Sequence, residues 1–445
     1  METNELLETV KSLLQACHLD GWEITLASSR TLTVEVKEQK VDTFKCAEPV
    51  GVSIRVLKNG GMGFSFTTSI TPDDLARMVE NALVGAGAQT PDEHHAFPAP
   101  EPCPEIPGLF DEGLASVPEE QKLGQAMELE RLVLAADPRV QKVRKCAYGE
   151  STVESRIVNS RGVDARYRGT SVSASASAIA EENGQSQMGW DFDFATHFAD
   201  LSVAQVAARA AAKATGLLGA TKIPTMRCPA VLDSYVATEI LEVLAPAFLA
   251  ENVQKGKSLL AGRRGESIVS PLLRIRDDGT LPGGMGTAPF DAEGVPKRNT
   301  VLVDGGVLQG YLYDTLRAAK DGVVSTGNAA RSGIKSPPHM GVSNFFIENG
   351  TVPFDGLLAG IDRGILITDV MGMHTANSIS GDFSVGAAGF LVEEGKVTVP
   401  VKGIAIAGNI LELFRSVEQV GNDLRFYGTV GAPSLRIAAL AVSGD

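Results

Sequence analysis

The sequence lacks any run of about 18 or more apolar residues, so it predicts no transmembrane helix. A basic, apolar leader is also missing, because the chain opens with the acidic stretch METNELLETVKSLL, and no signal peptide is expected. The five cysteines are odd in number and form no CxxC pair, which is typical of reduced thiols rather than of a disulfide framework. Together these absences predict a cytoplasmic protein.

Blocks of basic residues are scarce too. The formal net charge is −14, and a field of that sign repels the phosphates of a nucleic acid. The densest basic stretch is KVRK at 142–145, which we interpret as a solvated strand end. The sequence therefore predicts no direct binding to nucleic acid.

Common catalytic signatures are absent as well. The six histidines show no HExxH or HxH spacing, and no GxSxG nucleophile elbow occurs. One stretch, MHTANSISGDFSVGAAGF at 373–390, groups His374, Asp382 and Ser384. Ser and Asp commonly satisfy the backbone of turns, and we favour that interpretation. An autonomous hydrolase built on these three residues remains the alternative.

Regular patterns fill the first part of the chain. Apolar residues at helical spacing predict a helix over 4–17, and alternating segments after it predict strands. Asn59-Gly60 indicates a tight hairpin because both residues tolerate positive φ. Thr71 is a good N-cap, so a second helix is expected from there to about Leu83.

A second copy of this pattern follows. GQSQMGWDFDF at 184–194 echoes GGMGFSF at 60–66, and each precedes a capped, Ala/Leu-rich helix. We interpret this as a duplicated strand-meander-plus-helix unit, with the two copies packed side by side as similar layers. Between them, 89–118 holds seven prolines and predicts an extended crossing, followed by a helix over 118–136.

The character changes after about Pro224, where hairpin signals recur within antiparallel-type alternation, interrupted by helices at about 234–252 and 410–420. The hairpin turns are expected at Asp304-Gly305, Asn349-Gly350 and Glu394-Gly395. The predicted fold class is α+β, with a duplicated N-terminal α/β region and a larger antiparallel β-rich C-terminal domain. The predicted domains are 1–88 (N-terminal α/β), 89–117 (Pro-rich linker), 118–223 (central α/β) and 224–445 (β-rich).

Three stretches carry a resemblance to a known family. They are IVNSRGVDARYRGTSVSASASAIA at 157–180, STGNAARSGIKSPPHMGVSNFFIENGT at 325–351 and SGDFSVGAAGFLVEEGKVTVPVKGIAIAGNILELF at 380–414. In these the chain resembles the PmbA/TldD family, also called modulators of DNA gyrase, and the resemblance spans essentially its whole length. It implies three segments. It also implies two kinds of chain: TldD-type chains that bind zinc through HExxxH and a cysteine, and PmbA/TldE chains without those ligands.

This sequence falls on the PmbA/TldE side. The helix expected at 233–252 contains Glu239 and Glu242 but no histidine. Where the resemblance places the cysteine ligand, after Gly-Asp-Phe, the chain has Ala387 and Ala388. Carboxylates alone make a poor zinc site. We therefore expect no catalytic residue and no metal in this chain, with zinc only in a TldD-type partner.

The same helix is explained without a catalytic role. Pro246 is expected to kink or end it. The predicted buried stripe consists of Val236, Ile240, Val243, Leu244 and Phe248.

The resemblance implies a non-catalytic subunit of a cytosolic metalloprotease that acts on peptides or unfolded segments. Its partner would be a TldD-type subunit, and a homodimer is possible when that partner is missing. A protein-binding modulator of DNA gyrase is a further alternative.

A peptide could add a strand to an exposed sheet edge. The candidate substrate-binding residues lie in the segments that carry the resemblance, although turn or cap chemistry is the favoured interpretation of each. They are Asn328, Arg331, Ser343, Asn344 and Asn409.

Overall fold

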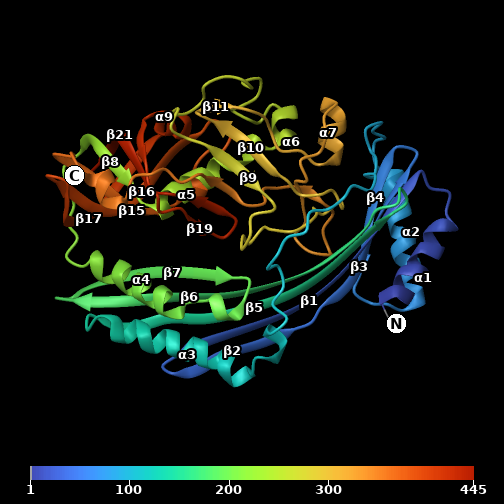
Figure 1. Ribbon diagram of the computed structural model, residues 1–445, viewed down its shortest axis with the longest axis horizontal. Coiled ribbons are helices and arrows are strands. Elements are labelled where there is room, and N and C mark those ends of the chain that lie inside the picture. Colours follow the sequence, from blue (N-terminus) through green and yellow to red (C-terminus); the bar gives the residue numbers. More distant parts are fainter. Residues whose placement is uncertain (1–2, 445) are drawn as a thin grey trace.

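The computed structural model describes residues 3–444. A long, curved sheet from the first half of the chain runs along one side, and the C-terminal half lies along the β7 side of that sheet (Figure 1). The N- and C-terminal ends lie at opposite ends of the long axis (Figure 1). The α+β fold class with a β-rich C-terminal part is confirmed.

The N-terminal sheet has seven antiparallel strands in the order β4-β3-β1-β5-β6-β7, with β2 also paired to β1. The predicted Asn59-Gly60 hairpin joins β3 to β4, and both residues have positive φ. The strands are β1 (Gly21–Lys37), β2 (Lys40–Ala47), β3 (Val50–Lys58), β4 (Gly61–Thr67), β5 (Val140–Asn159), β6 (Asp164–Glu182) and β7 (Gln185–Ala195).

The two copies of the repeat lie side by side, as expected, but they share one continuous sheet, so the expectation of two separate layers was wrong. The pairing of β1 with β5 joins them, from Glu23 opposite Asn159 to Val36 opposite Cys146. Continuous pairing satisfies the backbone groups of both long strands, which separate layers would leave exposed at four edges. The result is an extended platform.

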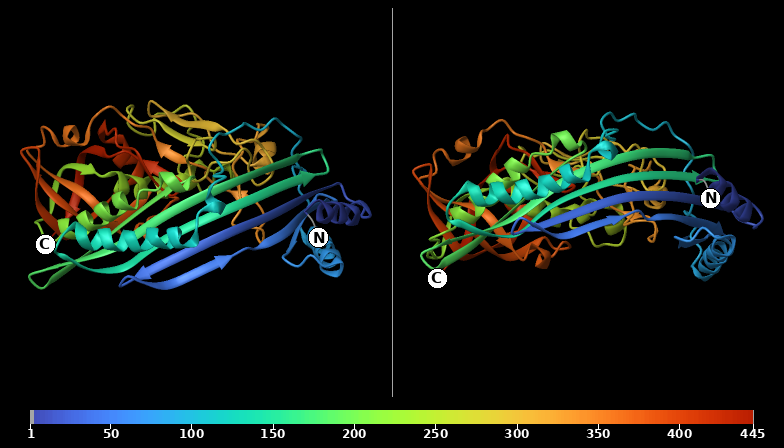
Figure 2. Two further views of the ribbon diagram at one scale, coloured as in Figure 1. Left: turned by 60° about the horizontal axis from the view of Figure 1, so that its bottom comes forward. Right: turned by 90° about the horizontal axis from the view of Figure 1, so that it is seen from below.

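Helices cover one side of each copy. Residue Thr71 caps α2, as predicted, and its hydroxyl accepts a hydrogen bond from the Asp74 amide. Helices α3 and α4 lie next to each other against β5, β6 and β7 (Figure 2). The helices are α1 (Thr3–Gln15), α2 (Pro72–Ala88), α3 (Glu119–Ala136) and α4 (Val203–Gly216).

The repeated Met-Gly-aromatic motif has one structural cause in both copies. A Cβ on Gly63 would lie 1.9 Å from the Ala82 carbonyl oxygen of α2. A Cβ on Gly189 would lie 2.3 Å from the Ala210 carbonyl oxygen of α4. Each glycine therefore permits a helix to lie directly on its strand.

The Pro-rich segment is an extended crossing, as predicted. No helix or strand occurs between α2 and Leu114 in the described chain. The Phe97 side chain is only 2% exposed, and the Asn159 side chain donates to the Pro98 carbonyl. The crossing is thus fastened to the N-terminal sheet.

The first C-terminal sheet has the order β17-β16-β15-β8-β21-β18, and an additional pairing of β17 with β21 closes a barrel. Its β15–β8 pairing is parallel. The strands are β8 (Met226–Leu232), β15 (Arg363–Met371), β16 (Asp382–Glu393), β17 (Lys396–Asn409), β18 (Val417–Val420) and β21 (Leu435–Ser443).

The second C-terminal sheet has the order β11-β10-β9-β14-β20-β19. Its strands are β9 (Ile275–Asp278), β10 (Asn299–Asp304), β11 (Val307–Leu308), β14 (Phe345–Ile347), β19 (Arg425–Tyr427) and β20 (Val430–Ala432), and β12 (Ala329–Ala330) pairs separately with β13 (His339–Met340). The helices of this half are α5 (Ser234–Leu244), α6 (Ala250–Gln254), α7 (Thr315–Asp321), α8 (Phe354–Leu358) and α9 (Ile410–Arg415). Helix α5 contacts β15 of one sheet and β20 of the other, within the largest apolar core.

Two of the three predicted C-terminal hairpins form, at Gly305 between β10 and β11 and at Gly395 between β16 and β17. The hairpin at Asn349-Gly350 was wrong. There the Gly350 amide donates to the Gly421 carbonyl, and the chain runs on to α8 without returning along β14. The helix predicted over 410–420 ends early, because residues from Val417 pair with β21.

No helix in the described part of the chain is long and apolar enough to cross a membrane.

Candidate functional site

Helix α5 occupies the place where the resemblance puts the zinc-binding helix of TldD-type chains. Its sequence explains where the helix begins, which side is buried and where it ends. The Asp233 carboxylate caps it by accepting from the Val236 amide at 2.8 Å. Of the predicted stripe, Val236, Ile240, Leu244 and Phe248 are buried, and Val243 is half-buried; Phe248 lies in the 3-10 turn beyond the helix. The helix ends at Leu244, and Pro246 lies in the 3-10 turn that follows, as expected.

The other side of α5 carries polar groups. The Tyr235 hydroxyl is hydrogen-bonded to Glu239, which is half-buried, whereas Glu242 is exposed. Burial, and then the charge of Glu242, raise the pKa of Glu239 above its ordinary value. Asp369 of β15 adds a further carboxylate, and burial raises its pKa too.

These residues do not fit a zinc ion. Protein zinc sites use tetrahedral sets of His nitrogen and Cys sulfur, with carboxylates as a minority. The described residues contain no group of three or more His, Cys, Asp or Glu that could hold a metal. On β16, Ala387 and Ala388 are buried and offer only methyl groups. No hydrolytic step through a metal follows from this donor set.

A cleft of about 350 Å³ lies beside α5, between the two halves of the molecule. One wall comes from β7 and α4, and the other from α5, β15 and β16; Figure 1 shows these elements next to each other. The lining residues are Met188, Gly189, Trp190, Ala212, Lys213, Leu217, Asp233, Tyr235, Thr368, Asp369 and Phe390.

A network of ion pairs centred on Asp191 joins the two halves of the molecule next to this cleft. The Asp191 side chain is fully buried, and its carboxylate contacts Arg209 at 2.7 Å, Lys213 at 3.1 Å and Arg425 at 2.9 Å. Burial alone would raise the pKa of Asp191, but hydrogen bonds from the arginines and the Lys213 charge lower it. Because Arg425 belongs to β19, this carboxylate joins the N-terminal sheet to the C-terminal half.

Two carboxylates of the cleft have no ion pair among the described residues. Burial raises the pKa of Asp233 to about 7, against an opposing hydrogen bond from Val236. Asp369 follows a bulge between Ile367 and Asp369, and its one hydrogen bond comes from the Val370 backbone. A bulge re-aims a side chain, which explains why a strand with a buried interior presents Asp369 to the cleft.

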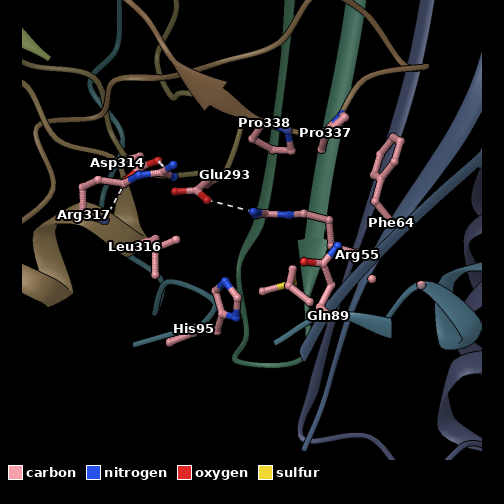
Figure 3. Close-up of a pocket in the computed structure, with 14 residues that line it drawn as sticks. Arg55, Phe64, Gln89, His95, Glu293, Asp314, Leu316, Arg317, Pro337 and Pro338 are labelled. Atoms are coloured by element: carbon pink, nitrogen blue, oxygen red, sulfur yellow. Dashed lines mark hydrogen bonds and ion pairs between the residues drawn. The ribbon is translucent and has the colours of Figure 1, made fainter. Parts of the chain in front are cut away.

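A second cavity, of about 370 Å³, separates the far end of the sheet from the C-terminal half. Figure 3 shows Arg55 reaching across it to Glu293, at 2.8 Å. The same guanidinium pairs with Glu23 at 2.6 Å. On the other side Arg317 pairs with Asp314. Because these lining charges are matched inside the protein, the cavity has a neutral wall that favours no ligand charge.

Three of the predicted substrate-binding residues gather at β9. The Asn328 amide donates to the Asp277 carboxylate at 2.7 Å, and the Ser343 backbone amide donates to the same group at 2.7 Å. The Asn344 amide donates to the Asp278 carbonyl at 2.7 Å. All three are buried, so the structure shows their internal bonds. Contact with a peptide stays a prediction.

The other two lie elsewhere. The Arg331 guanidinium donates to the Ser53 hydroxyl at 2.7 Å. It lies beside Arg55, Glu23 and Glu293, which we call the Arg55 cluster. Asn409 caps α9, the alternative foreseen for it, and donates to Asp382 at 3.0 Å. The five residues therefore do not form one site.

The alternative catalytic group is not assembled either. Asp382 is hydrogen-bonded to Ser380 and Asn409, and neither His374 nor Ser384 contacts it through a hydrogen bond. All three members of the group are exposed. The arrangement is that of a capped turn, in which Asp382 orders the backbone.

The cleft residues were missed by sequence reasoning. Trp190 was noticed only as part of the repeat, and Asp369 and Lys213 carry no local motif. Their one available signal is the WDFDF stretch, where acidic residues alternate with large aromatic ones on a strand.

The three models that describe PmbA/TldA metallopeptidases match nearly all of the chain. The domain 1 model covers residues 22–86, the central domain model 112–218 and the C-terminal domain model 225–444. The fold is thus that of a metallopeptidase class. The chain belongs to the PmbA/TldD family.

Relatives named metalloprotease PmbA and metalloprotease TldD homolog both match the chain. The metalloprotease PmbA of Escherichia coli O157:H7 is 28% identical over 96% of this chain and 93% of its own length. A Thermotoga maritima crystal structure, described as a candidate modulator of a DNA gyrase, has 29% identity and a TM-score of 0.91, covering 99% of this chain and 100% of that one. TldE from Thermococcus kodakarensis has 25% identity and a TM-score of 0.90 over 99% of both chains.

Proposed function

We propose that this chain is a non-catalytic subunit of a cytoplasmic metalloprotease, which assembles with a TldD-type subunit and binds extended peptide segments. The zinc belongs to the partner. Without the partner, a homodimer is the alternative assembly.

The observation that carries the proposal is the donor set beside α5. Carboxylates and a phenol occupy the helix, and Ala387 and Ala388 of β16 offer only methyl groups, so the described residues there supply no tetrahedral zinc site. The similarity to TldE over the full chain supports the same assignment.

The test is reconstitution with a TldD-type metalloprotease. The chain and that subunit are co-expressed and co-purified, and peptide cleavage is measured for each alone and for the mixture. We expect cleavage by the mixture, inhibition by a zinc chelator, and full activity when this chain carries Glu239→Gln.

The Glu239→Gln variant is decisive because Glu239 is the half-buried carboxylate on α5, the position from which a general base would act. Replacing the glutamate of the partner's HExxxH helix is the matched control and should abolish cleavage. Loss of activity with Glu239→Gln in a mixture that still assembles would contradict the non-catalytic assignment.

The alternative function, modulation of DNA gyrase, predicts a different binding partner. A pull-down with this chain as bait should recover the TldD-type subunit. Recovery of gyrase without that subunit would favour the modulator instead.

A further inference from the structure

Strand β7 is the terminal strand of the N-terminal sheet, and its outer edge faces the cleft beside α5. The Phe192 carbonyl on this edge accepts from Arg425 at 2.6 Å. Alternate residues of a strand turn their backbone groups to the same edge, so Trp190 and Met188 share the edge of Phe192. The backbone groups of these two residues have no hydrogen-bond partner there in the described chain. An extended segment could pair with them.

The wall above this edge is acidic. Asp233 and Asp369 line the cleft without an ion pair among the described residues, because Lys213, the cation that also lines it, is paired with Asp191 at 3.1 Å. Asp369 comes from the bulged part of β15 and accepts only one backbone hydrogen bond, so its carboxylate has lone pairs left for a donor.

The floor is apolar and partly exposed. Met188 is 52% exposed and Trp190 is 40% exposed, so both side chains are accessible to a ligand in the cleft. Lys213 already lies 5.3 Å from the centre of the Tyr235 ring, so the cleft holds one cation against an aromatic face. Trp190 offers a second face of the same kind.

We propose that this cleft binds an extended peptide segment along β7, with a cationic nitrogen of the segment between Asp369 and Trp190. This inference rests on the proposed function, which assigns peptide binding to the chain but no preference for charge. The chemistry fits either a lysine or arginine side chain or an amino-terminal ammonium.

The test uses the full chain and short alanine peptides with a fluorescent label at the C-terminus. One peptide is acetylated and carries a central lysine, a second has norleucine in place of the lysine, and a third has norleucine and a free amino terminus. Fluorescence anisotropy gives each Kd. We expect the cationic peptides to bind about 10-fold more tightly than the neutral one, as charge-assisted hydrogen bonds imply. Comparing the first and the third peptide, each with the neutral second one, distinguishes the two sources of the cation.

The variant Asp369→Asn should remove the preference and leave binding of the neutral peptide unchanged. Asp362→Asn makes the same charge change at an exposed position just before β15 and should keep the preference. Trp190→Leu changes an exposed side chain and should weaken the binding of all three peptides. Its melting temperature should equal that of the wild-type protein. This variant therefore tests the cleft even if Asp369→Asn misfolds.

Equal Kd values for all three peptides would overturn the inference but leave the proposed function standing. A preference that survives Asp369→Asn would overturn it as well, because the cation would then lie elsewhere. If none of the peptides binds while the co-purified mixture still cleaves peptides, the inference about the cleft fails but the proposed function as a protease subunit stands. If the mixture is also inactive, the proposed function fails.

Discussion

At the scale of single residues, the junction of the two halves depends on buried carboxylates whose partners are known. Asp191 is the clearest case, because three cations from two elements converge on one fully buried side chain. A buried charge is tolerated only when it is paired, so removal of the common partner should cost more than any single pair is worth.

We therefore expect Asp191→Asn to lower the free energy of unfolding by at least about 2 kcal/mol, since it leaves Lys213 and Arg425 without their carboxylate partner, while Arg209 keeps only Asp193. Asp193→Asn is the control, because Asp193 is 34% exposed and pairs only with Arg209. It should cost less than about 1 kcal/mol. Urea unfolding of both variants measures the difference, and equal losses would contradict the assignment.

Asp233 gives a prediction in pH. Its pKa is raised from 3.8 to about 7, mainly by burial, so the folded protein holds a proton that the unfolded chain releases. The contribution of this group to stability is greatest below pH 3.8 and is lost as the pH rises towards 7.

The variant Asp233→Asn should escape this loss while keeping the helix cap, because asparagine is an equally good N-cap. Its stability relative to the wild-type protein should rise between pH 4 and 7 and then stay level, as the pKa of about 7 requires. Thermal unfolding across that range measures the difference. A stability difference that does not change with pH would contradict the raised pKa.

At the scale of elements, the repeat is built on close contact between a strand and its helix. Gly63 and Gly189 occupy the same place in the two copies, each against a helix backbone. The pattern of Met, Gly and aromatics predicted the repeat. It could not predict that the glycines are the contact, because that depends on where the helix packs.

Gly189→Ala should destabilise the protein by about 1–3 kcal/mol, because its Cβ would meet the α4 backbone at 2.3 Å. Gly87→Ala is the control, since it lies in α2 with nothing within 4 Å and should stabilise by less than about 1 kcal/mol. Differential scanning calorimetry of the two variants gives the sign of each change. A neutral Gly189→Ala would argue against the close contact.

The turns show which hairpins the local sequence can predict and which it cannot. Asn59-Gly60 and Glu394-Gly395 adopt the positive φ that their residues allow, and both form the predicted hairpins. Asn349-Gly350 has the same signal and forms none. A Cβ on Gly350 would lie 2.2 Å from the Val420 carbonyl oxygen, so this glycine serves a tertiary contact that no local pattern reveals.

At the scale of the whole molecule, two junctions fix the C-terminal half on the N-terminal sheet. One is the Asp191 network near the cleft, and the other is the Arg55 cluster at the second cavity (Figure 3). The fold class and most elements could be predicted, because periodicity and turn chemistry are local. The cleft could not, since Trp190, Asp233 and Asp369 come from three distant segments that only the tertiary fold brings together.

The Arg55 junction predicts a coupling between the halves. Arg55→Met should destabilise by about 3–5 kcal/mol, because Glu293 would remain buried without its ion pair and Glu23 would keep only the longer pair with Arg331, at 3.6 Å, among the described residues. Adding Glu293→Gln should recover part of that loss. Arg30→Met is the control, as its ion pair with Glu48 is exposed. Denaturant titration measures all the variants, and strict additivity of the first two changes would contradict the coupling.

The central claim is that this chain supports peptide cleavage without carrying the metal centre. The most direct measurement is the zinc content and peptidase activity of the purified chain by itself, before and after incubation with zinc. The account predicts no stoichiometric zinc and no cleavage in either condition. One zinc per chain together with chelator-sensitive cleavage would contradict it.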